Sequence, residues 1–310
     1  MKQPTILVVG SANMDLVVKA PRIPVPGETI LGGSFARVRG GKGANQAVAC
    51  SRLGATTFML GRVGTDSFGD ELLAGLQADG VFCQFLTRDE EAASGIAIIV
   101  IDEGGENAIV VAPGANGRVS AEDVGAVRGL SGADAILCQL EVPVEAVEAA
   151  LDVAREGGVR TVLDAAPPTA LPASLLAKVD VLSPNQTEAC AILGLPVDAC
   201  LAPEEAASRL LETGARQVVL KLGAEGALAA WDGGMERVPS FPIEPVDTTG
   251  AGDAFTAALA VNMAAGKDLL AATTAACAAG ALAATVFGAA PSMPTAQAVA
   301  EFMRKHGREG

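Results

Sequence analysis

A glycine-rich stretch near the C-terminus combines residue types that could hold an anion and move a proton. Residues 246–255 read Val-Asp-Thr-Thr-Gly-Ala-Gly-Asp-Ala-Phe, a polar turn that opens into an apolar helix beginning near Asp253. Backbone N–H groups of Gly250, Ala251 and Gly252 would approach an anion closely, and the helix dipole favours negative charge there. The Asp253 carboxylate could serve an attacking hydroxyl as general base. An N-cap aspartate after a turn is the alternative, but the full ten-residue string is more specific.

Three further polar segments are expected near this turn. Residues 40–46 form a second glycine turn that leads into a helix, and Lys42 and Asn45 offer donors to hydroxyl or phosphate oxygens. Residues 10–15 and 139–141 each follow a predicted strand. Ligands of open parallel sheets bind at the carboxyl ends of the strands. Each segment alone could be a loop cap, but three at one edge of a sheet favour a site for a small molecule with neighbouring hydroxyls.

Other kinds of site are disfavoured by what the sequence lacks. The Gly41-Lys42 pair lacks the first glycine of a Walker A loop, so a phosphate-binding loop of that kind is not expected. No G-x-G-x-x-G follows the first strand, and this absence argues against an NAD-dependent oxidoreductase. The single histidine, His306, excludes His-dependent triads and most His metal sites. The six cysteines contain no C-x-x-C pair and are expected to be reduced, buried thiols: Cys50, Cys83, Cys138, Cys190, Cys200 and Cys277.

The composition of the chain limits the classes of partner that it is expected to bind. The chain has 310 residues and a formal net charge of -14, which disfavours nucleic acid as a partner. The N-terminus shows no signal-peptide pattern, and the alanine-rich stretch 269–288 is expected to be a buried helix rather than a membrane span. We therefore expect a cytoplasmic protein that binds neither nucleic acid nor membrane.

Strand and helix patterns alternate along most of the chain, which predicts βαβ units. Strands are expected at 5–9, 56–60, 135–140, 160–164, 179–182 and 217–222, and helices at 44–53, 67–78, 144–155 and from about 186 and 203. From Asp253 onward the chain reads as nearly all helical. This succession predicts an α/β fold, a three-layer α/β/α domain spanning residues 1–310 with a mainly parallel central sheet.

Two regions, 15–38 and 82–111, break this alternation. The second contains strand patterns at 82–87, 95–101 and 107–111 without intervening helices, and Gly104-Gly105 is a turn between the last two. Together the two regions predict a small antiparallel sheet inserted in the domain. Such a sheet could be a lid that excludes water from a ligand, or an ordinary surface extension.

These motifs resemble those of the ribokinase (PfkB-type) family of carbohydrate kinases, and the resemblance extends along essentially the whole chain. Residues 40–46 and 61–69 look like the family's N-terminal motif, and residues 247–255 look like its C-terminal motif. The resemblance implies ATP-dependent phosphorylation of the terminal (O5) hydroxyl of D-ribose. A sibling kinase for 2-deoxyribose, a ketose such as fructose, or a nucleoside stays open, as does a non-catalytic sugar-binding protein.

The resemblance also implies a role for each matching residue, with Asp253 as base beside an anion hole of Gly250, Ala251 and Gly252. The sugar would contact Asn13, Met14, Asp15, Gly41, Lys42, Gly43, Ala44, Asn45 and Glu141, with Ala97 and Ile99 facing it from the lid. ATP would contact Asn185, Lys221, Leu222, Gly223, Ala224, Glu225, Gly226, Gly252, Asp253 and Cys277, the last standing where some members place a histidine against adenine. Glu188 would organise Mg²⁺ through water, and an activating K⁺ would lie at Asp247, Thr249, Ala283, Val286, Gly288 and Ser292. The lid would also build a homodimer.

Overall fold

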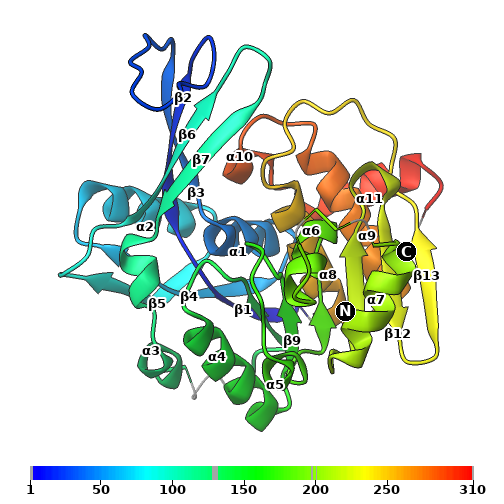
Figure 1. Ribbon diagram of the computed structural model, residues 1–310. Helices are drawn as coiled ribbons and strands as arrows, with labels where there is room; N and C mark the ends of the chain where they lie inside the picture. Colours follow the sequence, from blue (N-terminus) through cyan, green and yellow to red (C-terminus); the bar gives the residue numbers. More distant parts are fainter. Residues whose placement is uncertain (1–2, 128–131, 197, 200, 309–310) are drawn as a thin grey trace.

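The computed structural model describes residues 3–127, 132–196, 198–199 and 201–308, and within them the strands form one nine-stranded and one four-stranded sheet (Figure 1). The large sheet has the spatial order β13 (Gly234–Val238), β12 (Ala227–Trp231), β11 (Gln217–Lys221), β10 (Val181–Leu182), β9 (Arg160–Leu163), β8 (Ala135–Cys138), β1 (Thr5–Val9), β4 (Thr56–Gly64), β5 (Phe82–Asp89). Neighbours from β11 to β5 pair in parallel, and only the β11–β12–β13 edge is antiparallel. The prediction of a mainly parallel sheet is confirmed.

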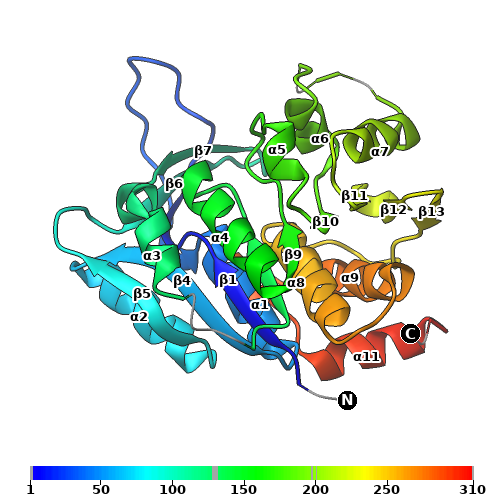
Figure 2. The same cartoon turned by 90° about the horizontal axis from the view of Figure 1, so that it is seen from below.

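Helices cover both faces of this sheet, because its central strands bury alternate side chains in two separate cores. On β1, Ile6 and Val8 join one core, and Leu7 and Val9 join the other. The first core includes α1 (Lys42–Arg52), α2 (Ser67–Ala78), α8 (Ala251–Ala264), α9 (Leu269–Ala283) and α11 (Ala296–Lys305). The second includes α3 (Ala121–Gly125), α4 (Val144–Gly157), α5 (Ala173–Leu176), α6 (Gln186–Ile192) and α7 (Pro203–Glu212). Figure 2 shows the two helical layers on opposite sides of the sheet, confirming the three-layer architecture.

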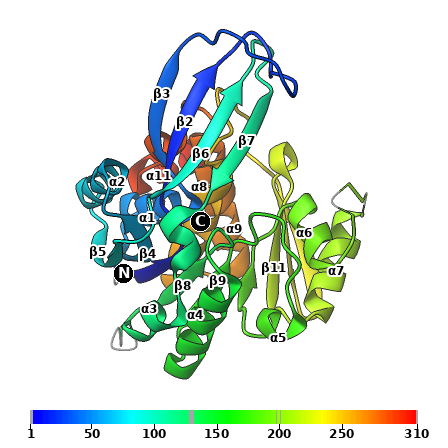
Figure 3. The same ribbon diagram turned by 60° about the vertical axis from the view of Figure 1, so that its left-hand side comes forward.

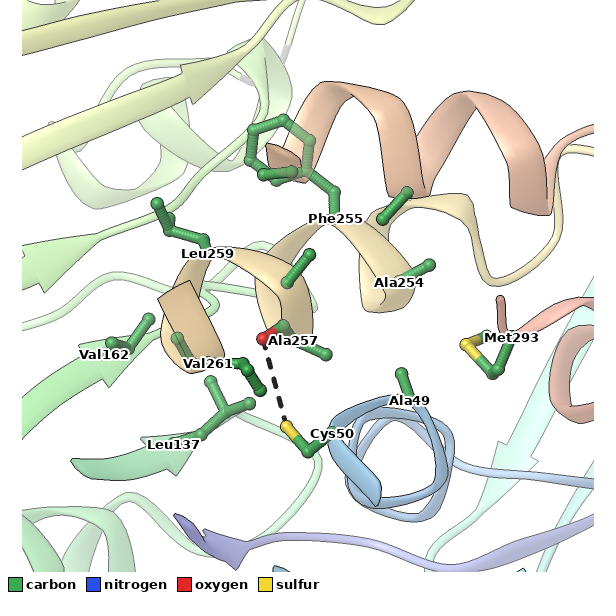
Figure 4. Packing of buried hydrophobic residues seen from close by; sticks show 14 of the residues in the cluster. Ala49, Cys50, Leu137, Val162, Ala254, Phe255, Ala257, Leu259, Val261 and Met293 are labelled. Atoms are coloured by element: carbon green, nitrogen blue, oxygen red, sulfur yellow. Dashed lines mark hydrogen bonds between the residues drawn. The ribbon is translucent and has the colours of Figure 1, made fainter. Parts of the chain in front are cut away.

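Helix α8 lies at the centre of the first core. It is apolar on every side, and each residue from Asp253 to Val261 is buried. Figure 4 shows Cys50 of α1 and Leu137 of β8 beside it, and Phe255 directed toward α9. Alanine at many contact positions lets the neighbouring helices approach closely. The first turn of α8, which carries Asp253, is therefore fixed by packing along the rest of the helix.

The small sheet stands away from the body, as Figures 1 and 3 show. Its spatial order is β3 (Phe35–Gly40), β2 (Asn13–Lys19), β6 (Gly95–Ile101), β7 (Asn107–Ala112). The outer pairs, β2–β3 and β6–β7, are antiparallel, whereas the inner strands β2 and β6 run parallel. The turn at Gly104-Gly105 connects β6 and β7 as predicted. The short helices η1 (Gly114–Arg118) and α10 (Ala289–Ser292) lie near its base.

The prediction that residues 82–87 belong to the small sheet is wrong. They lie in β5, which pairs in parallel with β4 at the edge of the large sheet (Figure 2). The physical reason is that α2 precedes β5 and completes a βαβ unit, and Phe82 and Phe85 of β5 pack on Phe58 at ring-centroid distances of 5.1 and 6.1 Å. The part of 82–111 that enters the small sheet is therefore β6 and β7.

The antiparallel edge, β12 and β13, was not anticipated. Ala227–Trp231 is alanine-rich and so has weak strand propensity, and η2 (Gly223–Glu225) precedes it. Within the described residues no helix is both long and apolar enough to cross a membrane. Five described cysteines are free thiols, and Cys200 lies outside the described residues.

Candidate active site

The large sheet brings three polar segments to one edge. Val9, Cys138 and Leu163 are aligned as neighbours at the carboxyl ends of β1, β8 and β9. The residues that follow these strands therefore start at the same level. The N-terminus of α1 packs against the first of these segments, since Ala44 N donates to Ser11 O at 2.8 Å. The sheet edge, α1 and α8 together form the site.

Asp253 is the buried acid at the centre of this arrangement. It is the third residue of α8, after Gly250, which caps the helix with a φ of 79°. Its Oδ2 accepts from Asn45 Nδ2 at 2.9 Å, its Oδ1 accepts from Gln46 Nε2 at 3.1 Å, and Lys42 Nζ lies 4.0 Å from Oδ1. Burial raises the pKa of Asp253, and the charge of Lys42 and the two amide donors oppose that rise. The structure thus brings together Asp253, Lys42 and Asn45, as predicted.

A second carboxylate, Glu141, organises the neighbouring polar pocket. Its Oε2 accepts from Ser11 Oγ at 2.5 Å, from the Lys42 backbone N–H at 3.0 Å and from Asn13 Nδ2 at 3.4 Å. Burial, followed by the charges of Glu141 and Asp253, raises the pKa of Asp15 to about 7. This pocket contains Asn13, Asp15 and Glu141, as the sequence predicted.

Lys42 lies between these carboxylates. Burial alone would lower the pKa of Lys42, but the surrounding carboxylates, Asp253 foremost, raise it above its ordinary value. Its neighbour Gly43 is held close to the β1–β2 connection, where a Cβ atom would lie 2.5 Å from Ser11 N. Lys42 is therefore positively charged and lies beside the Asp253 carboxylate.

The other residues predicted to contact the sugar have different positions. Met14 is fully buried in the first core, so its side chain does not face the polar pocket. Ala97 and Ile99 of β6 pair with Asp15 and Val17, so they share the face of the small sheet that carries Asp15. Gly41 and Ala44 belong to the start of α1, where backbone rather than side chain is available.

A cavity of about 420 Å³ lies on the other side of Asp253, which we call the α8–α9 cavity. Six residues predicted to contact ATP line it: Lys221, Gly223, Ala224, Gly226, Gly252 and Cys277. Phe241, Pro242, Ile243 and Phe255 give it apolar walls. A cavity with apolar walls that opens at a helix N-terminus suits a ligand with one flat apolar end and one anionic end.

Five of the residues assigned to nucleotide or Mg²⁺, Asp253 among them, do not line this cavity. Leu222 is buried in the second core, and Glu225 pairs with Arg237 at 3.3 Å. Asn185 caps α6 in a capping box, in which its Oδ1 accepts from Glu188 N at 2.8 Å and its backbone N donates to Glu188 Oε2 at 2.6 Å. The Glu188 carboxylate is thus held in a fixed orientation by α6.

Asp247 connects two of the other residues assigned to K⁺, Thr249 and Gly288. Its Oδ1 accepts from Thr249 N and its Oδ2 from Gly288 N, each at 2.9 Å. The Ala283 carbonyl, at the end of α9, accepts from Val286 N at 3.1 Å, and Ser292 Oγ donates to the Ala289 carbonyl at 2.7 Å. Within the described part of the chain no group of three or more His, Cys, Asp or Glu side chains could hold a metal ion. One carboxylate with several carbonyl oxygens fits a weakly charged, hard cation.

The sequence analysis did not identify the residues that connect Asp253 and Asn13 with the rest of the site. Gln46 Nε2 donates both to Asp253 Oδ1 at 3.1 Å and to Asp164 Oδ2 at 2.7 Å, and its Oε1 accepts from Gln139 Nε2 at 2.6 Å. The buried Asn116 donates from Nδ2 to Asn13 Oδ1 at 2.7 Å and so orients that side chain. Asp164 is the last residue of the predicted strand 160–164, which was a usable signal. No sequence pattern marked Asn116.

Comparison with known proteins gives full-length matches. A profile of the pfkB family of carbohydrate kinases matches residues 3–296. The ribokinase of Bacillus subtilis is 40% identical over 299 residues, covering 96% of this chain and 99% of the relative. The deoxyribokinase of Salmonella typhi is 35% identical over 252 residues, covering 81% and 82%. The solved structure of Arabidopsis thaliana ribokinase complexed with ribose and ATP matches with a TM-score of 0.89 at 34% identity, covering 98% and 99%.

Proposed function

Since this chain belongs to the pfkB family of carbohydrate kinases, we propose that it transfers the γ-phosphoryl group of ATP to the terminal (O5) hydroxyl of D-ribose. The observation that carries the proposal is the position of Asp253. This buried carboxylate lies at the first turn of α8, between the polar pocket of Asn13, Asp15 and Glu141 and the α8–α9 cavity. The full-length similarity to ribokinases supports ribose as the sugar.

In this reaction Asp253 accepts the proton of the sugar hydroxyl as that oxygen attacks the γ-phosphorus. The N–H groups at the start of α8 stabilise the charge on the phosphoryl oxygens. Ala251 N already donates to Thr248 O at 3.1 Å, so of the three residues predicted to form the anion hole we keep Gly250 and Gly252, and we add the N–H group of Asp253. The small sheet, closing as a lid, excludes water from the reacting atoms.

Two cations complete the proposal. When bound with ATP, Mg²⁺ supplies neutralisation of the phosphate charge, and Glu188 would hold it through water. Asp247, Thr249 and the carbonyl groups of Ala283, Val286 and Gly288 would hold K⁺, with Ser292 alongside. Because Asp247 joins the loop before α8 to the loop after α9, K⁺ there would steady the turn that carries the anion hole.

The lid supports a further proposal, that two copies of the chain associate. Ile109 and Val111 lie on the same face of the small sheet as Ala97 and Ile99 and are 53% and 46% exposed. A second copy would cover this apolar face. The variant Ile109→Lys should shift the mass measured by light scattering from dimer to monomer, whereas the same substitution at exposed Met235, on β13, should not. We place the reaction in the cytoplasm, where ATP is available.

The test is ADP release with a panel of ribose, 2-deoxyribose, fructose and adenosine. We expect ribose to give the highest kcat/KM. A preference for 2-deoxyribose would instead favour the deoxyribokinase alternative, which the similarity to the Salmonella typhi enzyme raises. The variant Asp253→Asn should lose about 10² to 10⁴ in kcat while still binding sugar, because a general base contributes that much.

The matched control for this variant is Asp268→Asn. Asp268 caps α9 by accepting from Ala271 N at 2.8 Å, and asparagine caps a helix about as well. This control should keep normal turnover. Near-normal turnover of Asp253→Asn would refute the assignment of the base.

A further inference from the structure

The Lys221 side chain connects the α8–α9 cavity with the buried carboxylates behind it. It is the last residue of β11, lines the cavity, and is only 13% exposed in its side chain. Its Nζ lies 2.5 Å from Asp164 Oδ1 and 3.7 Å from Glu188 Oε2. A Cβ atom on Gly252 would lie 3.9 Å from the same Nζ. The ammonium group is therefore beside the first turn of α8, where the phosphoryl group is proposed to bind.

Asp164 holds this ammonium group and links it to the base. It is 1% exposed, and its Oδ2 accepts from Gln46 Nε2 at 2.7 Å while its Oδ1 faces Lys221. The same Gln46 nitrogen donates to Asp253 Oδ1 at 3.1 Å. A continuous polar chain thus runs from Lys221 through Asp164 and Gln46 to Asp253. Each position along the chain is fixed by a partner, so the ammonium group is preorganised.

If Lys221 served only to neutralise Asp164, the ion pair would be explained. The position of the ammonium group at the wall of the cavity would not be explained. An ammonium group carries three N–H donors, and among the described residues only Asp164 is at hydrogen-bonding distance from it, since Glu188 is 3.7 Å away. Donor capacity therefore remains on a cation that lines the cavity next to Gly252. Phosphate oxygens are the ligands that such a cation would take there.

We propose that Lys221 is a catalytic residue that contacts the γ-phosphoryl group during transfer, and that Asp164 is the positioning residue that holds it. The inference rests on the proposed function. The bond from the γ-phosphorus to its bridging oxygen breaks, a bond to the sugar oxygen forms, and Asp253 takes the sugar's proton. Lys221 keeps its own proton throughout and stabilises the negative charge on the phosphoryl oxygens.

A double-mutant cycle separates this role from simple charge neutralisation. Lys221→Met should lower kcat by about 10², as removal of one preorganised donor does, and should change the KM for sugar by less than about twofold. It should also lower Tm, because Asp164 loses its partner. Adding Asp164→Asn should restore Tm but not kcat. Recovery of kcat in the double variant would show that Lys221 only neutralises Asp164, and would overturn the proposal.

A binding measurement keeps the proposal testable if the double variant does not fold. By calorimetry, Lys221→Met should weaken binding of ATP more than binding of ADP, since only ATP carries the γ-phosphate. Equal weakening of both nucleotides would overturn the proposal. This measurement needs no sugar, so a wrong choice of sugar leaves it intact.

The matched control is Lys178→Met. Lys178 also pairs with two carboxylates, Glu148 at 2.9 Å and Asp152 at 2.7 Å, but lies away from the cavity. It should leave kcat and the ratio of ATP to ADP affinity unchanged. A kcat loss in this control as large as that of Lys221→Met would assign the effect to general destabilisation and overturn the proposal.

Discussion

Replacing Gln46 with methionine should move the acidic limb of the pH–rate profile to higher pH. The substitution keeps a similar volume but removes the amide that donates to Asp253 Oδ1 at 3.1 Å and to Asp164 Oδ2 at 2.7 Å. A hydrogen bond to a charged group contributes about 1.5–3 kcal/mol, and about 1.4 kcal/mol corresponds to one pH unit. Since the bond stabilises the ionised base, its loss raises the pKa of Asp253 further. The limb should therefore move up by about one to two pH units.

The assay is kcat/KM for the sugar, measured by ADP release between about pH 5 and pH 9. The matched control is Gln139→Met, because Gln139 Nε2 donates to Gln46 Oε1 at 2.6 Å and, in the part of the chain that the structure describes, to no carboxylate. That control should shift the limb much less. A profile of Gln46→Met that overlays the wild-type profile would refute the view that Gln46 stabilises the ionised base. Loss of activity at every pH without a shift would refute it equally.

Three more predictions follow from the site. Burial and neighbouring carboxylates raise the pKa of Asp15 from 3.8 to about 7, so the stability it contributes when protonated is lost as pH rises through that range. Asp15→Asn should therefore raise Tm more at pH 8 than at pH 5, and an equal gain at both would contradict the pKa. Gly43→Ala places a Cβ 2.5 Å from Ser11 N, so it should cost about 1–3 kcal/mol in stability and raise the KM for sugar, as melting curves and kinetics will show. Asp247→Asn should reduce the ratio of activity with K⁺ to activity without it, and an unchanged ratio would remove Asp247 from the cation site.

The acid and its turn could be predicted from the sequence because both lie in one short segment. Gly250 and Asp253 are three residues apart, so local helix geometry alone fixes their relation. The mainly parallel sheet followed from the alternation of strand and helix patterns, which is also a local signal. Asn13 and Glu141 were found because each comes just after a strand.

The connecting residues could not be predicted because their partners are distant in the sequence. Gln46 and Asp164 are 118 positions apart, and their contact depends on how α1 packs against the sheet. Asn116 reaches Asn13 from 103 positions away. The position of β5 was misjudged because its sequence resembles the strands that follow it, and only its place after α2 assigns it to the large sheet.

The burial of α8 from Asp253 to Val261 separates two tasks proposed for the molecule. Asp253 and the turn proposed to face phosphate belong to the same packed helix, so the spacing between them should not depend on which sugar is bound. The groups proposed to recognise the sugar, such as Asn13, Glu141 and Ala97, lie outside α8. Substituting those groups can therefore change the sugar specificity and leave Asp253 and the preceding turn unaltered. This makes the fold a natural starting point for engineering kinases with new acceptors.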